Sequence, residues 1–176
     1  MNWPNRLSVL RVLCIPVIVA LMCFSAPWCR WASVGIFVLA ALTDFFDGYL
    51  ARKHHWITDF GKFIDPVADK LLVLSTFVML VHLELLPGWA VVIILARELS
   101  IDGLRLVAMT KQKVSSAGKL GKIKTCSQML LILLLMVTRV PAFSVWYGIA
   151  AASWVLLITL WSGFDYFRNN LGVFRE

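Results

Sequence analysis

Charged residues are scarce in this sequence, and their scarcity excludes an ordinary soluble domain. Only 15% of the 176 residues are charged, whereas 60% are hydrophobic and the mean hydropathy is +0.82. A soluble domain of this length needs more polar surface than that composition provides. The sequence therefore predicts a single integral membrane domain over residues 1–176.

Cysteine motifs and a cleavable leader are also missing. The chain contains four cysteines, which are Cys14, Cys23, Cys29 and Cys126. They form no Cys-x-x-Cys pair and no Cys/His spacing typical of zinc, so we interpret them as small buried hydrophobic residues. The first apolar run holds Arg11 and Pro16 and is followed by no convincing cleavage site, so we expect it to remain as a membrane helix.

Acidic residues are outnumbered by basic ones, 10 to 17, which leaves a net charge of +7. In a soluble protein that excess would suggest nucleic acid. In a membrane protein it indicates one face of the bilayer together with anionic headgroups or phosphate substrates. We therefore expect membrane lipids as partners and no nucleic acid.

Six apolar segments account for almost the whole chain, and each is about as long as a helix that crosses a bilayer. They cover approximately residues 7–23, 31–52, 61–83, 89–109, 123–140 and 143–164, with a polar loop at 53–60. Tryptophan and arginine near the N-terminus indicate a short helix at the membrane interface. The predicted fold is an all-α integral membrane protein, a six-transmembrane-helix bundle with a short N-terminal interfacial helix.

The basic residues also predict the orientation. Six spans place both termini on one side, and only Arg30 and Arg139 of the seventeen basic residues are then assigned to the other side. The positive-inside rule makes the fifteen-residue side cytoplasmic. We expect a bacterial cytoplasmic (inner) membrane protein whose active site faces the cytoplasm.

Four aspartates gather where the second apolar segment gives way to the third. Asp44 and Asp47 are three residues apart, and Asp65 and Asp69 are four apart, so each pair shares one face of a helix. Carboxylates in apolar surroundings need a cation between them. Ligation by oxygen alone suits Mg²⁺, Mn²⁺ or Ca²⁺ and disfavours Zn²⁺.

Small residues and an arginine accompany the aspartates. Gly48, Ala51 and Gly61 lack bulk, which lets a ligand approach, and the planar fork of Arg52 suits phosphate. The alternative is that the acids are only solvated at the interface, which is how we interpret Asp59. Four aspartates in register with small residues favour a binding site.

The order of these residues resembles a family signature. Residues 44–69 read Asp-x2-Asp-Gly-x2-Ala-Arg-x8-Gly-x3-Asp-x3-Asp and match the CDP-alcohol phosphatidyltransferase signature at every fixed position. The resemblance implies a phosphatidyltransferase with two divalent cations, Mg²⁺ or Mn²⁺, a CDP-linked lipid donor, an alcohol acceptor and release of CMP. It also implies a homodimer, although no Gly-x3-Gly motif marks an interface.

The resemblance further implies roles for single residues. The implied metal ligands are Asp44, Asp47, Asp65 and Asp69, of which Asp69 is also the catalytic base. The residues implied to bind CDP-diacylglycerol are Gly48, Ala51, Arg52 and Gly61.

A second cationic group is not required by the donor and indicates a phosphorylated acceptor. Its members are Arg97, Arg105, Lys119, Lys122 and Lys124. Arg97 and Arg105 interrupt an apolar segment, so they should face the bundle interior or a wet cavity. The alternative, lysines that only bind anionic lipid, is the one we prefer for Lys111 and Lys113.

Two further stretches resemble one branch of the family, the bacterial phosphatidylglycerophosphate synthases. They are residues 5–11, where Ser8 stands in place of the more usual threonine, and Arg97-Glu98 with residues 121–125 and Gln128. This resemblance implies phosphatidyl transfer from CDP-diacylglycerol to sn-glycerol 3-phosphate, which yields phosphatidylglycerophosphate and CMP in phospholipid biosynthesis.

Two alternatives stay open. Another acceptor, such as serine, inositol phosphate or phosphatidylglycerol, would use the same chemistry, but an acceptor without phosphate leaves Arg97 and Arg105 unexplained. A small divalent-cation transporter would need carboxylates deeper in the bilayer than the cytoplasmic ends of the segments, where they cluster.

Overall fold

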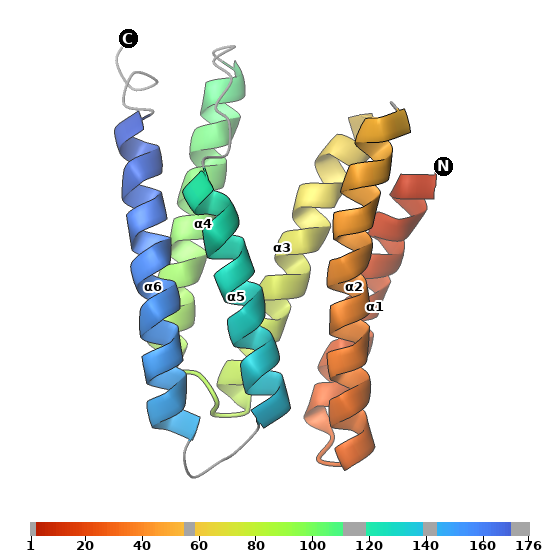
Figure 1. Cartoon of the computed structure of the whole chain (residues 1–176), viewed down its shortest axis with the longest axis vertical. Coiled ribbons are helices and arrows are strands. Elements are labelled where there is room, and N and C mark those ends of the chain that lie inside the picture. Colours follow the sequence, from red (N-terminus) through yellow and green to blue (C-terminus); the bar gives the residue numbers. More distant parts are fainter. Residues whose placement is uncertain (1–2, 55–58, 111–118, 139–143, 170–176) are drawn as a thin grey trace. The chain divides into compact units, whose positions relative to one another are not determined.

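The computed structural model describes residues 3–54, 59–110, 119–138 and 144–169, which form six α-helices and no strand (Figure 1). Side chains are described for residues 7–43, 67–108, 120–138, 149–150 and 152–168. The helices are α1 (Trp3–Cys23), α2 (Pro27–His54), α3 (Asp59–His82), α4 (Gly88–Thr110), α5 (Lys119–Thr138) and α6 (Ser144–Asn169). The predicted all-α class is thereby confirmed over the described ranges.

Two predicted boundaries were wrong. We expected a separate interfacial helix at the N-terminus, but Trp3–Cys23 is one continuous helix, in which Pro4 occupies the first turn where no amide donor is needed. We also expected a polar loop over residues 53–60, but α2 continues to His54 and α3 already begins at Asp59. Polarity alone does not end a helix when neither glycine nor proline follows.

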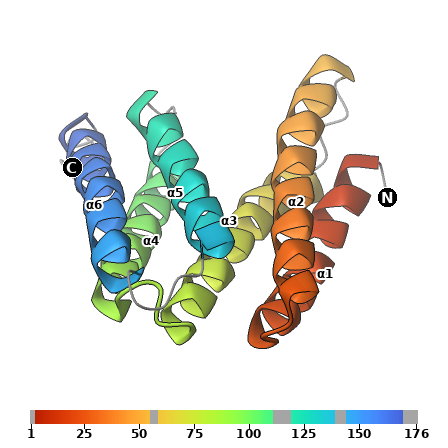
Figure 2. The same cartoon turned by 60° about the horizontal axis from the view of Figure 1, so that its bottom comes forward.

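The first compact unit comprises residues 1–79 and 136–138. Within it α1 and α2 lie side by side and run in opposite directions, joined by a short connection at residues 24–26 (Figures 1 and 2). Pro27 begins α2 with a backbone angle that suits a helix, and the carbonyl of Ala26 accepts from the amide of Cys29 at 3.1 Å. The antiparallel pair positions the carboxyl half of α2, which carries Asp44.

A buried arginine links these two helices. Arg11 on α1 is 2% exposed, and its Nε donates to the backbone carbonyl of Ala40 on α2 at 3.2 Å. The hydroxyl of Thr43 donates to the same carbonyl at 2.8 Å. A buried guanidinium needs acceptors in place of water, so this contact holds α1 against α2 one helical turn before Asp44.

The second compact unit comprises residues 80–135 and 139–176. Here α4 and α6 pack side by side and run in the same direction (Figures 1 and 2). Ile101 and Leu104 of α4 form a buried cluster with Tyr166 of α6. This packing brings one face of α6 against the charged half of α4.

The end of α3, in this second unit, is capped by a Schellman motif. The amide of Leu85 donates to the carbonyl of Leu80 at 2.9 Å, and the amide of Glu84 donates to the carbonyl of Val81 at 3.0 Å. Glu84 has a φ of 57°, a left-handed conformation that normally selects glycine. Leu80 and Leu85 are both buried, which supplies the apolar contact typical of this cap.

Helix α5 holds the one described stretch that is long and apolar enough to cross a membrane, Leu120–Thr138, with a mean hydropathy of 1.6. Shorter apolar helical stretches occur at Leu7–Cys23 and Pro27–Thr43. In α4 the apolar pattern is interrupted by Arg97, Glu98, Asp102 and Arg105. The prediction of six spans is therefore not confirmed by helix length and composition.

The cysteines only partly follow the prediction that they are buried hydrophobic residues. Cys29 is buried and Cys14 is half-buried, whereas Cys23 and Cys126 are exposed. The prediction was wrong for the last two because they lie on the outer sides of helices that are apolar on more than one face.

Candidate functional site

The backbone places the aspartate pairs on two helices, as the spacing predicted. Asp44 and Asp47 lie in α2, and Asp65 and Asp69 lie in α3, so each pair keeps a helical spacing that puts it on one face. Asp69 is half-buried. The side chains of Asp44, Asp47 and Asp65 lie outside the described residues.

The residues predicted to bind the donor are also helical in their backbone. Gly48, Ala51 and Arg52 lie in the last turns of α2, and Gly61 lies in the first turn of α3. Their side chains lie outside the described residues. Among the side chains that the structure does describe, no group of three His, Cys, Asp or Glu residues is placed to hold a metal ion.

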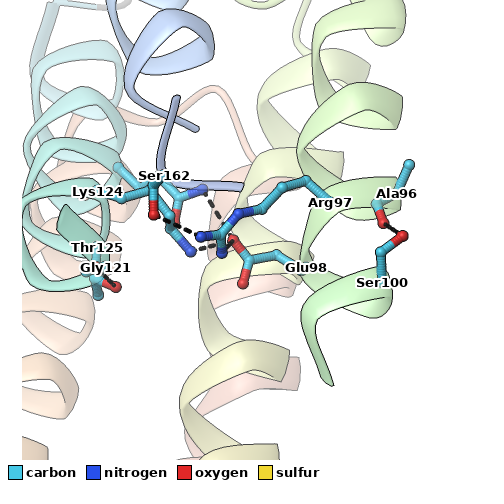
Figure 3. Close-up of polar contacts among 9 residues, drawn as sticks. Ala96, Arg97, Glu98, Ser100, Gly121, Lys124, Thr125 and Ser162 are labelled. Atoms are coloured by element: carbon cyan, nitrogen blue, oxygen red, sulfur yellow. Dashed lines mark hydrogen bonds and ion pairs between the residues drawn. The ribbon is translucent and has the colours of Figure 1, made fainter. Parts of the chain in front are cut away.

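A buried polar network connects α4, α5 and α6 around Glu98 (Figure 3). The ammonium of Lys124 forms an ion pair with Oε1 of Glu98, and Nη1 of Arg97 lies 3.5 Å from the same oxygen. Nε2 of Gln128 donates to that oxygen at 3.5 Å. One carboxylate thus neutralises cations from two helices, which is the condition under which charges persist in an apolar interior.

Arg97 also reaches the third helix of this network. Its Nη2 donates to the hydroxyl oxygen of Ser162 on α6 at 2.7 Å, as Figure 3 shows. A β-carbon added to the neighbouring Gly163 would lie 3.3 Å from Cγ of Arg97. The guanidinium is therefore held from one side by a hydroxyl, while its alkyl stem lies against a residue with no side chain.

Arg105 lies two helical turns further along α4 and also contacts α6. Its guanidinium carbon lies 5.5 Å from the centre of the Tyr166 ring, within the range of a cation–π interaction. Nε of Arg97 and Nε of Arg105 are both buried and lack a hydrogen-bond partner among the described residues. Such donors are satisfied when an anion binds between them.

The predicted cationic group is divided by the helix geometry of α5. Lys124 is buried against Glu98, whereas Lys122 is exposed, because residues two apart on a helix point to opposite sides. Lys119 begins α5, but its side chain lies outside the described residues. Arg97 and Lys124 thus meet at the carboxylate of Glu98, whereas Lys122 lies on the exposed side of α5.

Sequence reasoning assigned no site role to Glu98, Gln128 or Ser162. A signal existed for Gln128, because it lies four residues after Lys124 and shares its helix face. No sequence signal identified Ser162, which lies 65 positions from Arg97 in the chain. Its place beside Arg97 follows only from the packing of α6 on α4.

The structure thus has two pairs of aspartates on consecutive helices and, on α4, two half-buried arginines whose Nε atoms are buried. Residues 1–161 match the family model described as CDP-alcohol phosphatidyltransferase. The chain therefore belongs to the CDP-alcohol phosphatidyltransferase family, a membrane-associated family of transferases.

Curated relatives cover nearly the whole chain. A protein of Bacillus subtilis named CDP-diacylglycerol–glycerol-3-phosphate 3-phosphatidyltransferase is 38% identical, covering 96% of this chain and 95% of its own. A protein of the same name from Rickettsia typhi is 37% identical, and the match covers 95% of this chain and 96% of the relative. Another from Cereibacter sphaeroides is 31% identical, and the match covers 100% of this chain and 99% of the relative.

Proposed function

We propose that this protein transfers the phosphatidyl group of CDP-diacylglycerol to sn-glycerol 3-phosphate, with formation of phosphatidylglycerophosphate and CMP, in phospholipid biosynthesis. The proposal depends on the relatives described above. They share one name, are 31–38% identical to this chain, and match it over nearly the full length of both proteins. Arg97 and Arg105 of α4, whose Nε donors are buried without a partner among the described residues, support a phosphorylated acceptor, because the donor has Arg52 and the aspartate site for its own phosphates.

The membrane arrangement that we propose has all six helices crossing the bilayer with the active site at the cytoplasmic face. Exposed apolar stripes support it. On α6 one face is formed by Trp154, Leu157, Trp161 and Phe164, each at least 62% exposed. Apolar surface of that extent is unfavourable in water and suits lipid. The homodimer implied by the family resemblance belongs to the same proposal.

The four aspartates offer only oxygen donors, which suits two Mg²⁺ or Mn²⁺ ions. The ions would be held by Asp44, Asp47, Asp65 and Asp69, and when bound would neutralise the donor diphosphate and polarise its phosphorus. The helical spacing of both pairs fits such a cofactor, since the two residues of each pair lie on one face of their helix.

The protein residues then account for the proton and the substrates. Asp69 removes the proton from the 1-hydroxyl of sn-glycerol 3-phosphate as its oxygen attacks the lipid-side phosphorus. The bond from that phosphorus to the CMP oxygen breaks, and CMP leaves. The donor is bound by Gly48, Ala51, Arg52 and Gly61, and the acceptor phosphate by Arg97 and Arg105. The lysines Lys119, Lys122 and Lys124 add positive charge to the acceptor region, where Lys124 is paired with Glu98 and Lys122 lies on the exposed side of α5.

The test is CMP release from CDP-diacylglycerol by the purified protein in detergent with Mg²⁺ or Mn²⁺. We expect release with sn-glycerol 3-phosphate, and none above background with serine, inositol, inositol phosphate or phosphatidylglycerol. Release with another acceptor would overturn the acceptor assignment and retain the family chemistry. If no acceptor supports release while the protein carries divalent metal into liposomes, the transferase proposal is wrong and the transporter is favoured.

A further inference from the structure

Arg97 and Arg105, both half-buried on α4, contact the same helix, α6. Arg97 donates to the Ser162 hydroxyl at 2.7 Å, and Arg105 lies over the Tyr166 ring at 5.5 Å. Ser162 and Tyr166 are four residues apart and therefore share one face of α6. Both are buried, so neither contact is subject to competition from bulk water.

The two contacts tie both arginines to a short stretch of α6. Arg97 and Arg105 are eight residues apart on α4, a rise of about 12 Å, whereas the two α6 residues that contact them are separated by a rise of about 6 Å. Because α4 and α6 run in the same direction, the first arginine contacts the first α6 residue and the second contacts the second (Figures 1 and 2). Each guanidinium keeps a buried Nε donor without a partner among the described residues, and such donors suit a phosphate group.

Gly163 completes the arrangement. A β-carbon at this position would lie 3.3 Å from Cγ of Arg97, so the arginine side chain would have to shift by a few tenths of an ångström, and 3.7 Å from Nε, an ordinary contact distance. The glycine lets the stem of Arg97 lie directly on the α6 backbone. A side chain here would therefore move Arg97 relative to Ser162.

We propose that Ser162, Gly163 and Tyr166 are positioning residues that set the separation of Arg97 and Arg105, and thereby the affinity for the phosphate of the acceptor. This inference rests on the proposed acceptor role of the two arginines. It names three α6 residues that do not touch the acceptor and that act only through the arginines of α4.

The experiment measures KM for sn-glycerol 3-phosphate and for CDP-diacylglycerol separately in the purified enzyme. Ser162→Ala should raise the acceptor KM about tenfold, the loss expected for one hydrogen bond to a charged group. Gly163→Ala should raise it by less, because it moves Arg97 only slightly and leaves the Ser162 hydroxyl in place. Tyr166→Leu should raise it about fivefold through loss of the cation–π contact. The donor KM should stay within about twofold in all three, a split that general loss of structure does not produce.

Conservative variants and matched controls test the same contacts. Ser162→Thr keeps the hydroxyl and Tyr166→Phe keeps the ring, so both should remain near the parent enzyme. The controls are Ser153→Ala, an exposed serine on α6, Phe167→Leu, beside Tyr166, and Gly103→Ala, where an added β-carbon meets nothing within 4 Å. Inhibition by inorganic phosphate should weaken in parallel with the acceptor KM in the three test variants alone.

Failure of this inference differs from failure of the proposed function. If Arg97→Ala and Arg105→Ala raise the acceptor KM at least tenfold while the α6 variants leave it within twofold, the positioning role is wrong and the acceptor site stands. If the arginine variants alter only the donor KM, the acceptor site itself is wrong. Equal increases in both KM values in the α6 variants would indicate a general structural role and would also overturn the inference.

Discussion

The ammonium of Lys124 on α5 is paired with the carboxylate of Glu98 on α4, and both residues are less than 10% exposed. Arg97 and Gln128 approach the same carboxylate oxygen. One acid therefore links α4 to α5. Removal of the Glu98 carboxylate should therefore lower the free energy of unfolding much more than removal of an exposed ion pair would.

Glu98→Gln is expected to lower the stability of the protein by about 3 kcal/mol, because it leaves the buried Lys124 and the half-buried Arg97 beside a neutral amide. Thermal unfolding in detergent measures the effect. The double variant Glu98→Gln/Lys124→Met should recover part of the loss, since it removes one of the uncompensated charges. A double variant less stable than Glu98→Gln would contradict this interpretation. Ser100→Ala, at an exposed site on the same helix, is the control.

Lys122 and Lys124 should separate acceptor binding from stability. Lys122→Ala should leave the unfolding temperature unchanged, because the side chain is exposed, and should raise the acceptor KM with a dependence on ionic strength. Lys124→Ala should lower the unfolding temperature by breaking the buried pair with Glu98. Unfolding scans and acceptor titrations at two salt concentrations give both readouts. Equal unfolding temperatures for the two variants would count against the structural difference between these lysines.

Asp69→Asn should abolish CMP release and leave much of the binding of CDP-diacylglycerol intact, because the base is lost while three of the four proposed ligands stay. Asp44→Asn should weaken donor binding together with turnover. Chelation with EDTA should abolish CMP release by the parent enzyme, and added Mg²⁺ or Mn²⁺ should restore that release. Donor binding is measured directly with CDP-diacylglycerol in detergent micelles. Equal loss of donor binding in the two variants would show that Asp69 is principally a ligand.

Glu84→Gly is expected to stabilise the protein by about 1 kcal/mol, because glycine adopts the left-handed conformation of the α3 cap without steric cost. Glu84→Ala should be nearly neutral, and Glu84→Val should be destabilising, since a β-branched residue is least tolerant of positive φ. The three unfolding temperatures should therefore fall in the order glycine, alanine, valine. A glycine variant no more stable than the alanine variant would argue against strain at this position.

Arg11→Lys should lower stability by about 2 kcal/mol although it keeps the positive charge, because lysine has no donor at the position of Nε to reach the Ala40 carbonyl. The unfolding temperature in detergent is the measurement. Leu10→Met, an exposed neighbour on α1, serves as the matched control. Should the lysine variant unfold at the temperature of the parent, the contact between α1 and α2 does not depend on the guanidinium.

The sequence predicted well what one helix determines by itself. The apolar segments identified six helices, and the spacing of Asp44 with Asp47 and of Asp65 with Asp69 placed each pair on one helix face. These inferences hold because the period of a helix is a local property of the backbone. Helix ends were less accurate, since the polar residues between the second and third apolar segments were predicted to be a loop, whereas α2 continues to His54 and α3 begins at Asp59.

The sequence by itself thus determined the family, the helical class and the positions of both charged groups along the chain. Only the tertiary structure decided which groups meet. Arg11 with Ala40, Glu98 with Lys124 and Arg97 with Ser162 are 29, 26 and 65 positions apart. Their contacts depend on how the apolar faces of the helices pack, and many different sequences are compatible with the same packing. Residues far apart in the chain therefore come together without leaving a pattern in the sequence.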